Sequence, residues 1–148
     1  MTNYERTTAW LKACGKEPSP ANASLQIGCH IEEFCEFLKV LRPDGDGHAK
    51  LIERIRIDLD WFAGKLKRQE QFAYIPIELR EEALDALCDT EVTGNGVAYL
   101  LGMSKPPADD AVLCSNEAKL VDGKPVILDG GKIGKPSGWV APDLSKFV

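Results

Sequence analysis

Two segments of the chain carry acidic side chains at helical spacing. The first contains Glu32, Glu33 and Glu36, and the second contains Asp85 and Asp89. Residues three and four apart lie on one face of a helix, so each segment would present a line of carboxylates. Carboxylate oxygens suit hard divalent cations, and carboxylates from facing helices are a recurrent way for helical bundles to hold such cations. The pattern therefore predicts a divalent-cation site between two helices.

A solvated helix face is the alternative interpretation, because most runs of charge lie on protein surfaces. Two details favour a site. The acids are interleaved with apolar side chains such as Phe34 and Leu87, and no lysine stands four residues away to form a helical salt bridge. In addition, Gly94 and Gly96 follow Asp89, where they lower helix propensity unless a ligand or another backbone needs the room.

The elements that must position these acids are helices, judged by the spacing of apolar residues in steps of three and four. Helices are expected over residues 3–14, 24–41, 48–69 and 76–102. Ser24 is a reasonable N-cap for the second of them. Pro76 stands near the start of the last, and Gly102 stands at its end.

The last third of the chain has a different pattern. Asp122-Gly123 stands between the apolar segments 119–121 and 125–128, as the two-residue turn of a small hairpin would. Helical spacing in this part is limited to residues 108–113, after Pro106-Pro107, which we expect to close the preceding segment. Glycine and proline then interrupt any long regular element.

These observations predict an all-α protein with two parts. We expect a four-helix bundle over residues 1–103 and a Gly/Pro-rich extended tail over residues 104–148. Apolar residues in the tail, Trp139 among them, favour packing of the tail on the bundle or on a neighbouring subunit.

Composition narrows the classes of function. Lysine and arginine number 18 and aspartate and glutamate 23, which gives a net charge of −5. This balance argues against wrapping a nucleic-acid polymer, which needs a basic face. No apolar run approaches a membrane span and no secretory signal precedes the first helix, so a cytoplasmic location is expected. The five cysteines are never spaced C-x-x-C, and we expect them to be reduced and partly buried.

The motifs as a set resemble a known family. Glu32-Glu33-x-x-Glu36, Asp85-Ala-Leu-Cys-Asp89, Ser115-Asn116, Asp122-Gly-Lys124 and Lys135-Pro136 are similar to those of phage-type MazG-like, phosphoribosyl-ATP-pyrophosphohydrolase-like proteins. That family belongs to the all-α nucleoside triphosphate pyrophosphohydrolase superfamily. The resemblance runs from about residue 10 to residue 144 and implies a MazG-like helical bundle.

The resemblance also implies an activity, the Mg-dependent cleavage of a nucleoside triphosphate to the monophosphate and pyrophosphate, with Mn as a possible substitute. The implied metal ligands are Glu32, Glu33, Glu36, Asp85 and Asp89. Glu33 would also orient or deprotonate the attacking water. In the family's second motif, E-x-x-D, the glutamate position is Ala86 here, so Asp85 would take its place, whereas a register that pairs Glu82 with Asp85 loses the downstream spacing.

Substrate contacts and assembly follow in the same way. Gln26, Asn116, Lys119 and Lys132 are the expected substrate-binding residues. Guanine nucleotides are the first substrates to consider, with dUTP, dCTP or phosphoribosyl-ATP as alternatives. The family implies a homo-oligomer, with a tetramer favoured over a dimer, encoded by a phage and acting in the host cytoplasm. A non-catalytic helical oligomer is the alternative from another class.

Overall fold

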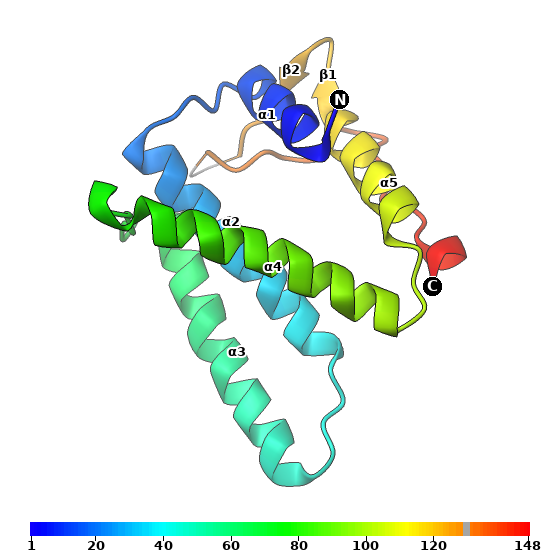
Figure 1. The fold of residues 1–148 in the computed structure, drawn as a ribbon. Coiled ribbons are helices and arrows are strands. Elements are labelled where there is room, and N and C mark those ends of the chain that lie inside the picture. Colours follow the sequence, from blue (N-terminus) through cyan, green and yellow to red (C-terminus); the bar gives the residue numbers. More distant parts are fainter. Residues whose placement is uncertain (129–130) are drawn as a thin grey trace. The chain divides into compact units, whose positions relative to one another are not determined.

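Helices dominate the computed structural model, which describes residues 1–128 and 131–148 (Figure 1). The α-helices are α1 Asn3–Ala13, α2 Pro20–Val40, α3 Asp46–Lys67, α4 Arg80–Leu100 and α5 Lys105–Glu117. Short 3₁₀ helices are η1 Ile77–Leu79 and η3 Ser145–Phe147, and the strands are β1 Leu120–Val121 and β2 Lys124–Pro125. The expected all-α class is therefore confirmed.

Contacts divide the chain into two compact units. One unit is Pro18–Tyr74, and the other combines Met1–Glu17 with Ile75–Val148. The first holds α2 and α3, and the second holds α1, α4, α5 and the C-terminal segments. The expected boundary at residue 103 stays a prediction.

In the Pro18–Tyr74 unit, α2 begins four residues earlier than expected. Ser19 caps it by accepting a hydrogen bond from the Asn22 amide at 3.1 Å, and Pro20 occupies the first turn. Proline is well suited to this place because the first helical amides have no partner within the helix. Ser24, the expected cap, is instead buried, and its hydroxyl accepts a hydrogen bond from the Ala73 amide at 2.9 Å. It thereby anchors the segment that follows α3.

The two helices of this unit lie side by side along much of their length (Figure 1). Cys35 and Leu66 are fully buried between them. Gly28 makes the close approach possible, since a Cβ there would lie 2.9 Å from Leu66 Cβ and 3.0 Å from the Ala63 carbonyl oxygen. The core of this unit is therefore the α2–α3 contact.

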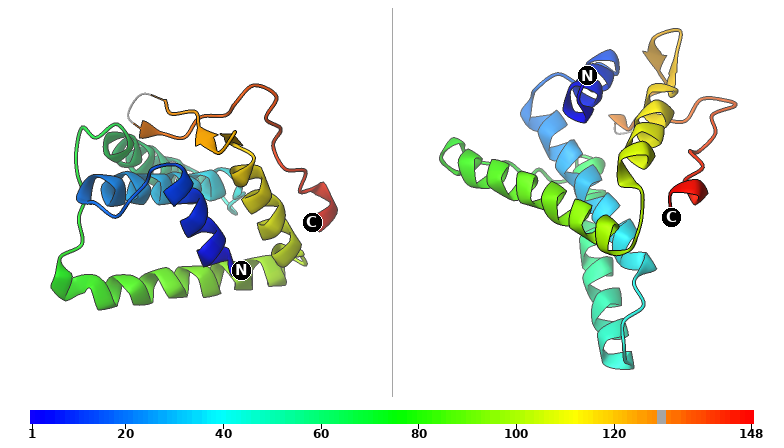
Figure 2. Two further views of the ribbon diagram at one scale, coloured as in Figure 1. Left: turned by 90° about the horizontal axis from the view of Figure 1, so that it is seen from above. Right: turned by 45° about the vertical axis from the view of Figure 1, so that its right-hand side comes forward.

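In the other unit, α1 lies against α5 (Figures 1 and 2). Arg6 joins the two helices: its Nε and Nη2 each donate to a carboxylate oxygen of Glu117 at 2.9 Å, and Nη1 pairs with Asp110. This fork geometry is the strongest that arginine makes with a carboxylate. A residue of the first helix therefore fixes the start of the expected tail.

Helix α5 is longer than the sequence predicted. It runs from Lys105 to Glu117, and Pro106-Pro107 lies in its first turn instead of closing the segment before it. Both prolines are compatible with this place because amides of the first turn need no helical acceptor. The predicted helix over residues 108–113 is the middle of α5.

The predicted hairpin is confirmed. Leu120 pairs with Pro125 and Val121 with Lys124 in antiparallel register. Asp122 and Gly123 have φ angles of 52° and 71°, as a type I′ turn requires. The C-terminus returns to the start of α5, where the Ser104 amide donates to the Phe147 carbonyl at 2.7 Å. The C-terminal end of the segment after α5 is thus hydrogen-bonded within its own unit.

Helix α4 follows η1 and ends at Leu100, with Gly102 just beyond it at a φ of +77°. The expected glycine stop is confirmed, whereas the first residues after Pro76 form a 3₁₀ turn. Most apolar side chains of α4 are exposed, and Ala98 is the only buried residue of this helix. None of the described helices is both long enough and apolar enough to cross a membrane.

Candidate functional site

The acids of α2 lie where the helical spacing predicted, on a helix held by α3. Glu32 is half-buried and forms an ion pair with Lys67 of α3. Glu36 is exposed and pairs with Lys39, three residues on, at 2.5 Å. Glu33 is exposed and makes neither an ion pair nor a side-chain hydrogen bond with another described residue. Glu33 is therefore the member of the set whose carboxylate is available to water or a cation.

These pairs correct one expectation from the sequence. The acids of α2 were expected to lack compensating lysines because none stands four residues away. Lys39 compensates Glu36 at three residues, and Lys67 reaches Glu32 from the next helix. The hydrogen bond from Lys39 to Glu36 raises the pKa of Lys39 above its ordinary value. The carboxylates of Glu32 and Glu36 therefore each have a lysine partner without a bound metal ion.

The acids of α4 are exposed. Asp85 and Asp89 lie one turn apart, and neither makes an ion pair or side-chain hydrogen bond with another described residue. Glu82, the alternative ligand, is exposed one turn before Asp85. Beyond Asp89 the backbone carries small residues, and a Cβ at Gly94 or Gly96 would meet nothing within 4 Å. There is therefore room for a side chain at both glycines.

The two lines of acids belong to different units. Glu32, Glu33 and Glu36 lie on α2 of Pro18–Tyr74, and Asp85 and Asp89 lie on α4 of the other unit. Among the described residues, no group of three or more histidine, cysteine or acidic side chains is arranged to hold a metal ion. The chemistry of the donors nevertheless fits Mg, because each line offers exposed carboxylate oxygens. Convergence of the two lines stays a prediction.

The predicted substrate contacts also divide between the units. Gln26 is exposed on α2, seven residues before Glu33, which places both on one face of the helix. Asn116 and Lys119 lie at the end of α5, where Lys119 Nζ donates to Asn116 Oδ1 at 2.8 Å. Lys132 is exposed in the C-terminal segment, and its carbonyl accepts a hydrogen bond from the Leu128 amide. Of the four, Asn116 and Lys119 are brought into contact.

The structure gathers aromatic residues around Lys119 that the sequence did not single out as a site. Lys119 Nζ lies 5.9 Å from the ring centre of Trp10 and 5.5 Å from that of Trp139. Lys135 Nζ lies 4.5 Å from the Trp139 ring centre. Trp10 is half-buried. The one signal in the sequence was the recurrence of lysine near tryptophan in a segment poor in acids.

Comparison of the chain with models of known protein families, with curated proteins and with solved structures found no significant match. The resemblance carried by the motifs therefore stays a prediction. The function has to be argued from the two lines of carboxylates and from the lysine–tryptophan contacts.

Proposed function

We propose that the protein is a Mg-dependent nucleoside triphosphate pyrophosphohydrolase, which converts a nucleoside triphosphate and water to the monophosphate and pyrophosphate. The observation that carries this proposal is the pair of exposed acidic lines, Glu33 with Glu36 on α2 and Asp85 with Asp89 on α4. An exposed carboxylate line that lacks lysine compensation on its own helix, as on α4, is costly unless a cation neutralises it. The sequence motifs favour the same chemistry.

The metal would be held by Glu33, Glu36, Asp85 and Asp89, with Glu32 kept beside them by its ion pair to Lys67. Bound Mg supplies neutralisation of the triphosphate and activation of water. Glu33 would accept one proton from the attacking water as the water oxygen bonds to the α-phosphorus and the bond from that phosphorus to the oxygen bridging to the β-phosphate breaks. The leaving group departs as pyrophosphate. Glu33 suits this role because no other described side chain holds its carboxylate.

The residues that we propose for substrate binding come from two parts of the chain. Gln26 shares a helix face with Glu33, and Asn116, Lys119 and Lys132 supply donors from the C-terminal part of the chain. Guanine nucleotides are the substrates we propose first, and the runner-up substrates are dUTP, dCTP and phosphoribosyl-ATP. Mn would substitute for Mg because it accepts the same oxygen ligands.

Assembly is part of the proposal. Leu84 and Leu100 on α4 are 63% and 82% exposed, and Trp61 on α3 is 58% exposed. Large apolar side chains that are exposed in a single copy of the chain favour an interface with another copy, in which they would be buried. We propose a homo-oligomer, a tetramer in preference to a dimer, that acts in the cytoplasm of a phage-infected cell.

A non-catalytic helical oligomer is the second candidate, and the ion pairs of Glu32 and Glu36 with lysines favour it. The experiment that separates the two is a screen of all canonical ribo- and deoxynucleoside triphosphates for pyrophosphate release, with Mg and with EDTA. The enzyme releases pyrophosphate from at least one nucleotide, and only with Mg. A silent oligomer releases none, and a non-hydrolysable triphosphate with Mg leaves its melting temperature unchanged.

A further inference from the structure

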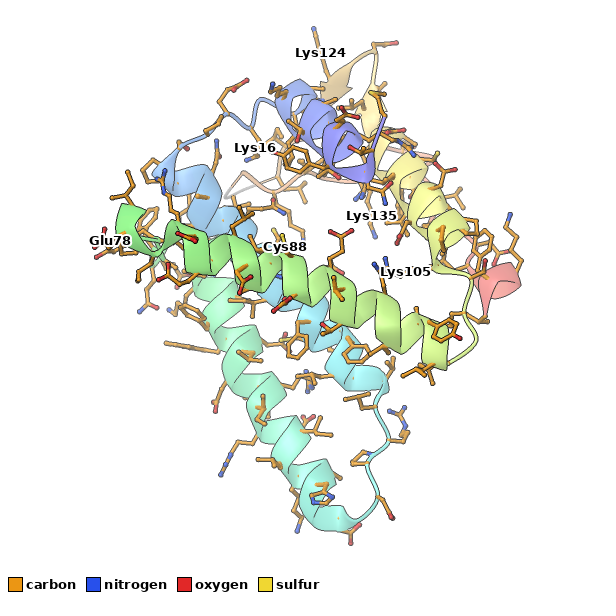
Figure 3. The ribbon with its side chains drawn as sticks, viewed as in Figure 1. Lys16, Glu78, Cys88, Lys105, Lys124 and Lys135 are labelled. Carbon is orange, nitrogen blue, oxygen red and sulfur yellow. The ribbon has the colours of Figure 1, made fainter. Side chains whose placement is uncertain are left out.

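A cluster of lysine and tryptophan side chains lies in the unit that contains α1 and α5. Lys119 stands between the rings of Trp10 and Trp139, and Lys135 lies over Trp139. Trp139 Nε1 donates to the Ser115 carbonyl at 2.9 Å, which ties the second ring to α5. Figure 3 shows Lys135 in the same region of this unit as Lys16, beside α1 and α5. We call Trp10, Ser115, Lys119, Lys135 and Trp139 the lysine–tryptophan cluster.

The cluster contains buried donors without an acceptor. Trp10 Nε1 and Ser115 Oγ are buried and have no hydrogen-bond partner among the described residues. An indole N–H can only donate, so Trp10 needs an acceptor, and no described residue of this unit supplies one. Buried polar groups left unpaired cost free energy, and in native proteins they are rare. An acceptor oxygen of a bound ligand would satisfy both atoms.

The segment that supplies Lys119, Lys135 and Trp139 of the cluster has a positive charge balance. Residues 118–148 contain five lysines and three aspartates and no glutamate, a balance of 5 − 3 = +2 in a chain whose net charge is −5. Cys14 is buried nearby, where the charges of Lys16 and Lys119 partly oppose the rise in its pKa caused by burial. Several ammonium groups, an N–H and an O–H thus share one neighbourhood. The complementary ligand is an anion with several acceptor oxygens.

We propose that the lysine–tryptophan cluster is a polyphosphate-binding site that works without a metal ion. Phosphate oxygens would accept from Trp10 Nε1, Ser115 Oγ and the ammonium groups of Lys119 and Lys135. The indole faces keep these ammonium groups near the ligand through cation–π attraction. The interpretation that this site holds the triphosphate of the substrate rests on the proposed function. The proposal that it binds polyphosphate does not.

The test is a titration of tryptophan fluorescence with inorganic tripolyphosphate and with dGTP, both in EDTA. Trp61→Phe is the background, because Trp61 lies outside the cluster on α3 and would add an unrelated signal. The proposal predicts a saturable change with both ligands, and no change with deoxyguanosine. Tripolyphosphate and dGTP share the phosphate chain, so a response to both reports phosphate binding. Deoxyguanosine lacks phosphate and reports binding of the nucleoside alone.

Two single variants make the test specific. Lys135→Ala should weaken tripolyphosphate binding by about tenfold or more, because a charge-assisted contact is lost. Lys124→Ala is the matched control: it removes the same charge from the hairpin, away from the cluster (Figure 3), and should leave binding unchanged. Equal weakening by both variants, binding of deoxyguanosine alone, or no saturable signal would each overturn the proposal.

Failure of this inference is distinguishable from failure of the proposed function. Binding of tripolyphosphate in EDTA with no hydrolysis of any nucleotide would support the polyphosphate site and contradict the proposed enzyme activity. The opposite outcome is Mg-dependent hydrolysis with no tripolyphosphate binding in EDTA and an unchanged KM in Lys135→Ala. It would support the enzyme activity and contradict the polyphosphate site.

Discussion

Glu32 of α2 forms an ion pair with Lys67 of α3, and both side chains are largely withdrawn from solvent, at 31% and 17% exposure. The pair spans the contact between the two helices beside Gly28, whose ideal Cβ would lie 3.1 Å from Lys67 Cγ. The first glutamate of the acidic motif is thus committed to the α2–α3 contact. Of the other two, Glu36 is exposed and pairs with Lys39, and Glu33 is exposed with no such pair among the described residues.

The pair should be measurable as a coupling free energy. In a double-mutant cycle with Glu32→Gln and Lys67→Met, we expect a coupling of about 0.5–1 kcal/mol in the free energy of unfolding, as for partly exposed pairs. Urea denaturation of the parent, the two single variants and the double variant provides the four values. Additive effects would mean that the pair contributes nothing to the α2–α3 contact.

Gly28 should be intolerant of a side chain. Gly28→Ala places a Cβ 2.9 Å from Leu66 Cβ and 3.0 Å from the Ala63 carbonyl, so we expect a loss of about 1–3 kcal/mol in unfolding free energy. Gly47→Ala in the first turn of α3 is the control, since a Cβ there meets nothing within 4 Å; it should gain about 0.4–1 kcal/mol. A stabilised Gly28→Ala would contradict the close helix contact.

The link between α1 and α5 should depend on pH. Hydrogen bonds from Arg6 lower the pKa of Glu117 below its ordinary value. A carboxyl with a depressed folded-state pKa contributes stability above its unfolded value, near pH 4.3, and loses that contribution as pH falls through the folded value. Glu117→Gln should therefore melt below the parent at pH 7, and the difference should shrink toward pH 3. A difference in melting temperature that is the same at both pH values would refute the role of the charge.

The helices themselves follow from local physics, and so most of the helical segments were predictable, whereas the four-helix bundle stays a prediction. Apolar spacing located α1, α2, α3 and α4, and Asp122-Gly123 located the hairpin. The start of α2 was misplaced because Ser19 and Ser24 are both adequate caps, and burial of Ser24 against Ala73 is a tertiary event. The full length of α5 was missed because proline was taken to end a helix where it begins one.

The candidate site was predictable only in part. Helical spacing is enough to place Glu33 with Glu36 and Asp85 with Asp89 on their helices. Pairing of Glu32 with a lysine 35 positions along the chain depends on how α3 packs, and local spacing carries no information about it. The lysine–tryptophan contacts likewise join α1 to residues more than 100 positions away.

The exposed apolar face of α4 leads to a prediction about assembly. Leu84→Arg and Leu87→Arg, three residues apart on one face of α4 and 63% and 53% exposed, should shift the proposed tetramer toward smaller species because a charge would be buried between copies. Thr93→Arg, at an exposed position on the opposite side of α4, is the control and should leave the mass unchanged. Light scattering gives the masses. A parent that is already monomeric at high concentration would contradict the proposed oligomer.

The most direct test of the account is Mg-dependent pyrophosphate release by Glu36→Gln and Asp89→Asn, assayed with the nucleotide that the parent cleaves best. Each variant should lose at least about 100-fold in kcat, because a carboxylate ligand of the metal is replaced by a neutral amide. Glu91→Gln, an exposed acid of α4 outside the motif, should retain parental activity, and circular dichroism should show the same helix content in all three. Loss of release in both motif variants, with Glu91→Gln unaffected, is the predicted result. Parental activity in either Glu36→Gln or Asp89→Asn would contradict the proposed site.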